Sequence, residues 1–150
     1  MISISHMLWF DDKAEEAANF YITLVPNSKM GTLSRNGDGN AFTVEFEIAG
    51  TKYVALNGGP MHTFNESFSI VITCDGQEEV DHYWNALIAD GGSEGRCGWL
   101  KDKFGLSWQV VPVQLMQCLG NPDPERAQRA MNAMMNMNKL IVAELEAAVA

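Results

Sequence analysis

Residues 6–21, HMLWFDDKAEEAANFY, decide the fold that this sequence predicts, because a related pattern occurs a second time in the chain. Shifted by 63 residues, the chain reads SIVITCDGQEEVDHYW over residues 69–84. Each segment combines an apolar strand, an aspartate, two glutamates and a helix with an aromatic pair. The matched positions are Asp12 with Asp75, Glu15 with Glu78, Glu16 with Glu79, Phe20 with Tyr83 and Tyr21 with Trp84. A repeat of about 60 residues exceeds a solenoid unit and predicts two half-domains that pack together.

An aspartate marks the predicted start of each helix. Asp12 is followed by Glu15 and Asp75 by Glu78, so each pair matches a capping box with Asp in the place of Ser or Thr. Apolar residues then recur at steps of three and four, which is typical of a buried helix face. These are Ala14, Ala17, Ala18, Tyr21 and Leu24 in the first helix, and Val80, Tyr83, Trp84, Leu87 and Ile88 in the second.

Short apolar or alternating segments around these helices read as strands. The first half has them at residues 2–10, 29–34, 41–48 and 52–56, the last two forming a hairpin. The second half has them at 68–73, 97–100 and 106–111, so we expect a shortened module in which one strand is in doubt. The prediction is a single α+β domain over residues 1–150, with two pseudo-symmetric βαβββ modules at 1–60 and 67–112.

A helical tail is predicted over residues 121–150, outside the repeat. Asp123 before Pro124 is an N-cap followed by proline at the first helical position. A stripe of small residues and methionines follows at helical spacing, formed by Ala127, Ala130, Met131, Met134 and Met135. Packing in a core is the first interpretation of this stripe. Because methionine surfaces adapt to varied partners, a dimer contact, a lid over a ligand pocket and a docking site for another protein stay open.

Composition narrows the class of partner. The 150 residues are 47% hydrophobic and 19% charged, as in a globular domain, and the net charge is −9. An acidic chain is a poor partner for nucleic acid and for anionic membranes, and no apolar run approaches the roughly 20 residues of a membrane span. Three cysteines without a CxxC pair predict reduced thiols and a cytoplasmic protein.

Six sequence strings together resemble one known family. They are LWFDDKAEEAANFY (8–21), VEFEIAG (44–50), ALNGGP (55–60), FNESFS (64–69), CGWLKDKFGLSWQVVP (97–112) and NPDPERAQRAMNAM (121–134). With the two βαβββ modules, they are similar to the PhnB-like family, whose members often carry the name 3-demethylubiquinone-9 3-methyltransferase. That family lies in the vicinal-oxygen-chelate superfamily, which includes glyoxalase I, extradiol dioxygenases and bleomycin-resistance proteins.

The resemblance implies sheets that curve around a shared cavity, and a homodimer. It also implies four metal-ligand positions, on which this sequence places His6, Ala55, Ser69 and Gln109. Because a catalytic divalent site needs about three or four good donors, no metal and no other cofactor is predicted. A divalent metal stays the alternative if Glu45 or Glu47 turns toward the cavity.

The resulting hypothesis is a binding protein for a small, mostly apolar molecule, in a cavity bordered by His6, Asn57, Ser69, Trp99 and Gln109. The alternative is an enzyme of the superfamily, either metal-dependent with rearranged ligands or metal-free with His6 as the base. Methyl transfer from S-adenosylmethionine is disfavoured, because the first strand ends in Asp11, Asp12 and Lys13 without a glycine-rich turn.

Three residues keep a structural interpretation beside the functional one. Asn57 either orients a ligand or begins the Asn-Gly turn. Trp99 is either a core residue or a stacking surface. Cys97 is either a buried small side chain or a nucleophile, and the latter requires a base or a positive neighbour.

Overall fold

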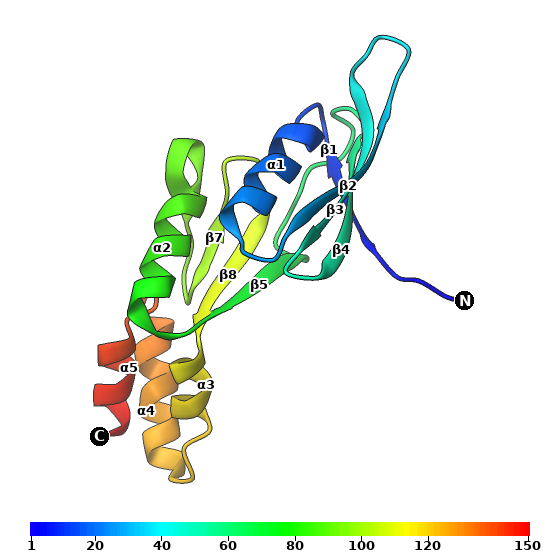
Figure 1. The fold of residues 1–150 in the computed structure, drawn as a ribbon. Helices are drawn as coiled ribbons and strands as arrows, with labels where there is room; N and C mark the ends of the chain where they lie inside the picture. Colours follow the sequence, from blue (N-terminus) through cyan, green and yellow to red (C-terminus); the bar gives the residue numbers. More distant parts are fainter. The chain divides into compact units, whose positions relative to one another are not determined.

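A computed structural model describes residues 1–150, which divide into two compact units, Met1–Phe64 and Asn65–Ala150. We refer to them as the first and the second unit. Each unit has its own four-stranded sheet and a helix on one face of it (Figure 1). Both have the order β-α-β-β-β, as the repeat predicts.

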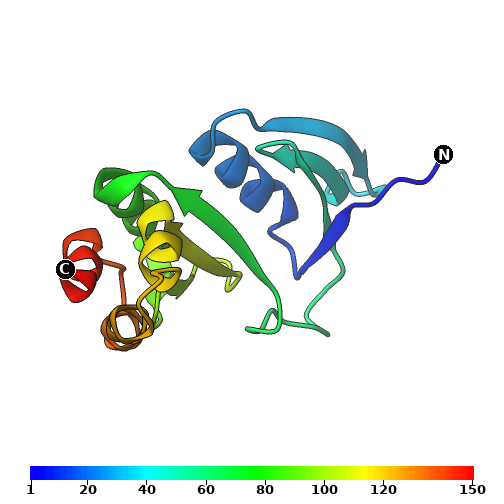
Figure 2. The same ribbon diagram turned by 90° about the horizontal axis from the view of Figure 1, so that it is seen from below.

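The first unit contains β1 (His6–Phe10), α1 (Ala14–Leu24), β2 (Lys29–Arg35), β3 (Ala41–Ile48) and β4 (Thr51–Asn57). The strand order is β1-β4-β3-β2, with β1 parallel to β4 and the other pairs antiparallel. Helix α1 lies along one face of this sheet (Figure 2) and buries four side chains, Ala14, Ala17, Ala18 and Tyr21. The Tyr21 ring stacks on Phe46 of β3 with centroids 6.3 Å apart, so the predicted helix face is confirmed.

The second unit repeats this order with β5 (Ser69–Cys74), α2 (Gly76–Ile88), the 3-10 turn η1 (Ala89–Gly91), β6 (Ser93–Glu94), β7 (Trp99–Lys101) and β8 (Ser107–Pro112). The strand order is β5-β8-β7-β6, with β5 parallel to β8. The strand in doubt is present as the two-residue β6, paired with β7. The module is therefore shortened but complete.

The repeat relates the helices and the strands by different offsets. The helix offset of 63 holds, since buried Ala17 and Tyr21 correspond to buried Val80 and Trp84. The same offset would match Leu8, which is 1% exposed, with Val71, which is 54% exposed. The buried positions of β5 are instead Ile70 and Cys74, an even number of residues from Leu8. Because strand side chains alternate between faces, pairing His6 with Ser69 was wrong.

Neither helix begins with the predicted capping box. The residue before α1 is Lys13, and the first helical N–H, that of Ala14, donates to Oδ1 of Asn57 at 2.8 Å. Asp75 does precede α2, but its side chain makes no capping bond. Its backbone N–H donates to Oε2 of Glu79 at 2.7 Å, one residue later than the expected Glu78.

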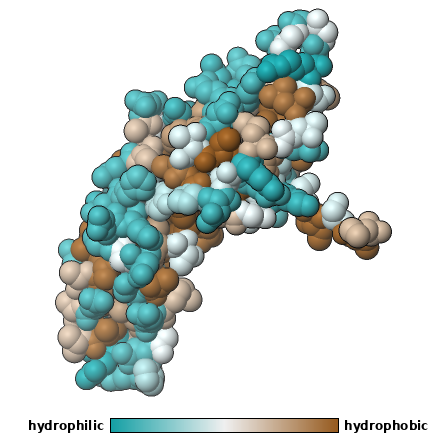
Figure 3. All heavy atoms as spheres, in the orientation of Figure 1, coloured by the Kyte–Doolittle hydropathy of each residue, from teal (hydrophilic) through white to brown (hydrophobic).

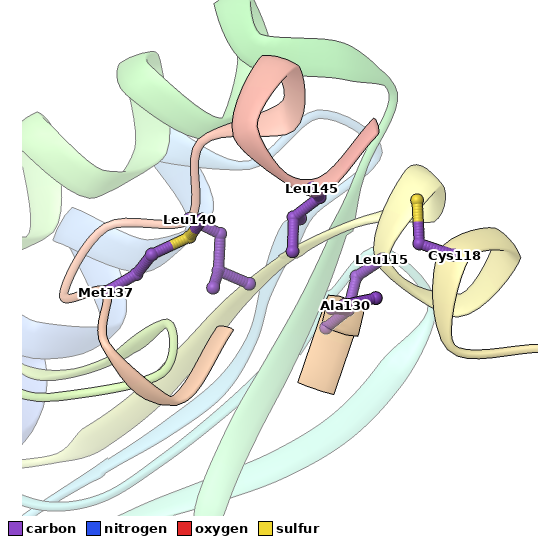
Figure 4. Packing of buried hydrophobic residues seen from close by; sticks show 6 residues of the cluster. All are labelled: Leu115, Cys118, Ala130, Met137, Leu140 and Leu145. Carbon is purple, nitrogen blue, oxygen red and sulfur yellow. The ribbon is translucent and has the colours of Figure 1, made fainter. Parts of the chain in front are cut away.

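Three helices follow β8, namely α3 (Val113–Leu119), α4 (Pro124–Met135) and α5 (Val142–Val149). Asp123 is the N-cap of α4, as predicted, and accepts from the Glu125 N–H at 2.9 Å. The three helices and the 136–141 loop share a core of six buried residues, Leu115, Cys118, Ala130, Met137, Leu140 and Leu145 (Figure 4). The expected methionine stripe is divided, since Met134 packs against this core while Met131 and Met135 are exposed.

The N-terminal segment before β1 extends away from its sheet and carries hydrophobic side chains (Figure 3). Met1, Ile2 and Ile4 are all highly exposed. The predicted strand over residues 2–10 therefore begins only at His6. None of the helices has both the length and the apolar character that a membrane span requires.

Candidate functional site

The face of the second sheet that points away from the buried core is the candidate site. In β8, Trp108 and Val110 are fully buried on one side, together with Leu100 of β7 and Ile70 of β5. Ser107 and Gln109 alternate with them and therefore lie on the opposite side. We name that side the outer face of the second sheet.

Strand register arranges the outer face in two rows. In the first row, Lys101 of β7 lies between Ser93 of β6 and Ser107 of β8, and Ser107 is paired in turn with Ser69 of β5. In the second row, Gln109 of β8 lies between Trp99 and Val71. Three of the five predicted site residues, Ser69, Trp99 and Gln109, are therefore neighbours on one surface.

A side-chain hydrogen bond connects the two rows. Nε2 of Gln109 donates to Oγ of Ser69 at 3.0 Å. The bond fixes the orientation of the Gln109 amide beside Trp99, which lies directly opposite on β7. Both side chains are only partly buried, so an amide and an indole are presented together.

A pocket of about 220 Å³ opens beside the first row, lined by Trp99, Lys101, Ser107, Glu66 and the 93–95 segment. Nζ of Lys101 and Oε1 of Glu66 are 2.6 Å apart. The hydrogen bond from Lys101, more than its charge, lowers the pKa of the Glu66 carboxyl below its usual range. Ser107 is 1% exposed, and its Oγ has no hydrogen-bond partner. A buried hydroxyl without a partner is unfavourable by about 1–3 kcal/mol, so this oxygen is suited to a bond that a ligand completes.

Lys101, Ser107 and Glu66 were missed as site residues by the sequence reasoning. The segment 101–105 had been interpreted only as a connection between strands. The available signal was the alternation in residues 107–110, where Ser107 and Gln109 are polar between Trp108 and Val110. Glu66 gives no such signal, because only the fold brings the 65–68 segment close to β7.

Asp102 is a further residue that the sequence reasoning did not single out. It is 2% exposed, and Oδ1 accepts from the backbone N–H groups of Phe104 and Leu106 at 2.9 and 3.0 Å. Oδ2 accepts from Nε1 of Trp108 at 2.9 Å. These bonds fix the β7–β8 hairpin, and with it the spacing between Lys101 and Ser107.

The two predicted site residues of the first unit lie on the side of the sheet that α1 covers. His6 is paired with Tyr53, whose ring is 5.5 Å from that of His6 and also 5.5 Å from that of Phe46. Nδ1 of His6 lies 3.3 Å from the Lys52 carbonyl oxygen. Asn57 accepts from Ala14 and donates through Nδ2 to the Ala41 carbonyl at 2.9 Å. Asn57 therefore connects α1, β3 and β4, which neither expected role included.

The positions implied for a metal offer few good donors within either unit. His6 and the fully buried Ala55 lie on the α1 side, while Ser69 and Gln109 are neutral and bonded to each other. Glu45 and Glu47 do lie on the side away from α1 and line a groove of about 340 Å³, where Lys29 and Glu47 are 3.5 Å apart. No three His, Cys, Asp or Glu side chains converge on one point. These donors do not fit a glyoxalase-type divalent metal.

Cys97 lies in the turn before β7, with a left-handed backbone φ of 58°. Its N–H donates to the Met137 carbonyl at 2.8 Å, and its Sγ is 3.8 Å from Sδ of Met135. The side chain is partly exposed rather than buried. The 136–141 loop thereby holds the turn that leads into Trp99.

Two βαβββ units in one chain define the class of protein, the vicinal-oxygen-chelate fold of glyoxalases and bleomycin-resistance proteins. The profile of the 3-demethylubiquinone-9 3-methyltransferase family matches residues 2–111, and the chain belongs to that family. No curated protein matches the sequence significantly. The helices after β8 lie beyond the matched residues.

Solved structures agree with this assignment. A PhnB protein from Bacillus cereus is 29% identical with a TM-score of 0.69, covering 75% of this chain and 100% of its own. Protein PA1353 from Pseudomonas aeruginosa is 18% identical with a TM-score of 0.61, over 75% and 98% of the two chains. The fosfomycin-resistance protein FosX from Listeria monocytogenes, solved with Mn(II) and sulfate, is 21% identical with a TM-score of 0.52, over 73% and 92%. The last two likenesses concern the fold alone.

Proposed function

We propose that the protein binds a small molecule on the outer face of the second sheet, with Trp99, Gln109 and Ser69 as contact residues. The observation that carries the proposal is the pairing of a partly exposed indole with an oriented amide, directly opposite on adjacent strands. Ligand sites typically combine an aromatic or apolar wall with a few oriented polar groups. The first sheet contributes no such pair on the side that α1 covers, because Asn57 is used in capping α1.

The pocket beside the first row, which Trp99 lines but Gln109 and Ser69 do not, restricts the part of the ligand that enters it. Its volume of about 220 Å³ lies below the roughly 300–1,000 Å³ of pockets for drug-sized ligands. The part of the ligand that lies in this pocket is therefore about the size of one substituted ring. The indole of Trp99 offers such a ring a flat contact surface.

A screen of single-ring compounds by ligand-observed NMR tests the proposal. Wild-type protein should bind a subset of them, Trp99→Ala should lose binding, and Gln109→Ala should weaken it about tenfold, equivalent to about 1.4 kcal/mol. Gln128→Ala is the matched control, because Gln128 also makes an amide hydrogen bond, to Asn132 on the exposed surface of α4. If the compounds bind the Trp99→Ala and Gln109→Ala variants as tightly as the wild type, the proposed site is wrong. Chemical conversion of a bound compound would assign an enzyme instead of a binding protein.

We also infer that two copies associate, as the family resemblance implies. The exposed apolar side chains of the N-terminal segment, Met1, Ile2 and Ile4, support this inference, since such side chains favour burial against another surface. Light scattering should give about twice the chain mass of 16.6 kDa. A mass of one chain at all concentrations would contradict the inference.

A further inference from the structure

The first row of the outer face contains one cation and three hydroxyls. Ser93, Lys101, Ser107 and Ser69 are consecutive neighbours across all four strands. A serine hydroxyl and an ammonium group can all donate hydrogen bonds to one anion. The side chains of the row therefore form a run of donors whose only cation is Lys101.

In the free protein the Lys101 ammonium is already paired with a carboxylate. Glu66 lies in the segment before β5, and its side chain is 64% exposed, against 42% for Lys101. An ion pair this accessible to water contributes little to stability. Another carboxylate can therefore replace Glu66 at little energetic cost.

The same pocket contains a hydrogen-bonding group that Glu66 does not satisfy. Ser107 lies directly opposite Lys101, and its buried Oγ lacks a partner. A ligand carboxylate has two oxygens, one for the Lys101 ammonium and one for the Ser107 hydroxyl. Trp99, two residues before Lys101 on the same side of β7, provides a wall for an attached ring.

We propose that the pocket binds a small aromatic monocarboxylate, with its carboxylate on Lys101 and Ser107, its ring against Trp99, and Glu66 as the internal group that it displaces. This inference rests on the proposed function, whose site it specifies. A single negative charge is favoured over a dianion, because one ammonium is available in the row and the chain carries a net charge of −9. The volume of about 220 Å³ accommodates one ring.

Isothermal titration of the full chain with benzoate and its uncharged analogue benzamide tests whether binding requires the negative charge of the ligand. Benzoate should bind about tenfold or more tightly than benzamide, as expected of a charge-assisted hydrogen bond. Raising the ionic strength should weaken benzoate binding and leave benzamide unchanged. Equal affinity of the two compounds would overturn the inference.

Substitutions test the residues. Lys101→Met should abolish the preference for benzoate, Ser107→Ala should weaken benzoate about fivefold, and Glu66→Gln should strengthen it because the competing carboxylate is gone. Lys29→Met is the matched control, since Lys29 is in an exposed ion pair with Glu47 in the first unit. Unchanged or weaker benzoate binding in Glu66→Gln would refute the displacement. If benzamide binds in a Trp99-dependent way while benzoate does not, the proposed function stands and this inference fails.

Discussion

The two units share the same packing of apolar side chains between helix and sheet but differ in the polar side chains whose hydrogen bonds stabilise it. Both bury the same stripe of their helix against the sheet, with Tyr21 in α1 and Trp84 in α2 at corresponding positions. In the first unit, Asn57 at the end of β4 binds the start of α1 and the start of β3. In the second, Asp102 binds three N–H groups within the β7–β8 hairpin. The repeat thus specifies the core, whereas the hydrogen bonds of Asn57 occur only in the first unit and those of Asp102 only in the second.

Removing the carboxylate of Asp102 should have the largest effect. Asp102→Ala removes the acceptor of three N–H donors, two of them in buried hydrogen bonds, and we expect it to lower the free energy of unfolding by about 3 kcal/mol. Urea unfolding followed by tryptophan fluorescence measures the loss. Asp38→Ala, which removes an exposed turn contact with the Asn40 N–H, should change it by less than about 0.5 kcal/mol. Equal effects of the two substitutions would remove the distinction between the units.

Removing the amide of Asn57 should destabilise the first unit to a smaller degree. Asn57→Ala deletes the cap of α1 and the bond to the Ala41 carbonyl, so we expect a loss of about 1–2 kcal/mol. Faster hydrogen exchange at the first turn of α1 would localise the loss to the first unit. Asn19→Ala is the control, because Asn19 donates only to a carbonyl of its own helix at an exposed site. An unchanged α1 in Asn57→Ala would show that the amide is free for a ligand after all.

Gln77 makes hydrogen bonds that the first unit lacks, because helices follow the last strand of the second unit, β8, whereas none follows β4 before β5. Its Oε1 accepts from the Val142 N–H at 2.7 Å, and Nε2 donates to the Leu140 carbonyl at 3.1 Å. Gln77→Ala should release the start of α5, at a loss of about 1 kcal/mol. Amide exchange at Val142 and Leu145 should accelerate while exchange in β5 does not. Uniform acceleration over the second unit would show that the tail and the sheet unfold together.

The sequence predicted the parts of the fold that depend on apolar periodicity. The buried faces of α1 and α2 were identified, because their apolar residues recur at helical spacing whatever the strands do. The strand phase was wrong, because the helices match at an odd offset of 63, whereas the buried strand positions Leu8 and Ile70 are an even number of residues apart. One offset cannot describe both elements, and a shift of one residue exchanges the faces of a strand. The repeat therefore matched His6, on the α1 side of its sheet, with Ser69 on the outer face of the second sheet.

The side-chain hydrogen bonds between distant residues could not be predicted from the sequence for a related reason. Asp12 and Glu15 satisfy a local capping pattern, yet the acceptor at α1 is Asn57, 43 residues from Ala14 along the chain. Similarly, Gln109 binds Ser69 at a separation of 40 residues. Partners this distant become neighbours only through strand pairing, which periodicity alone does not define. The choice of Ser69 and Gln109 was available from the resemblance, and the alternation at residues 107–110 was a signal for Ser107, whereas the position of Lys101 beside Ser107 required the register of β7 and β8.

The three cysteines all lie in the second unit, so thiol labelling reports on that unit selectively. The expected effect is the smallest of those considered, because only the rate of labelling changes. Burial, and secondarily Glu79, raise the pKa of Cys74 to about 11 from 9.0, and burial likewise raises the pKa of Cys118. The thiolate is the reactive form, so only the partly exposed Cys97 should react with iodoacetamide at pH 7.5. Cys97→Ser should lose this reaction, and urea should expose the other two thiols.

The raised pKa of Cys74 also sets the direction of a pH effect. The Cys74 thiol of the folded chain remains protonated above the pH at which the thiol of the unfolded chain ionises. Its contribution to stability is therefore complete below about pH 9 and is lost as the pH rises toward about 11. Labelling of Cys74 in the folded chain should therefore accelerate over that interval in the wild type. If Asp102→Ala makes Cys74 reactive at pH 7.5 while Asn57→Ala does not, the hydrogen bonds of Asp102 and those of Asn57 stabilise their own units independently. Exposure of Cys74 by both variants would instead show that the units unfold as one.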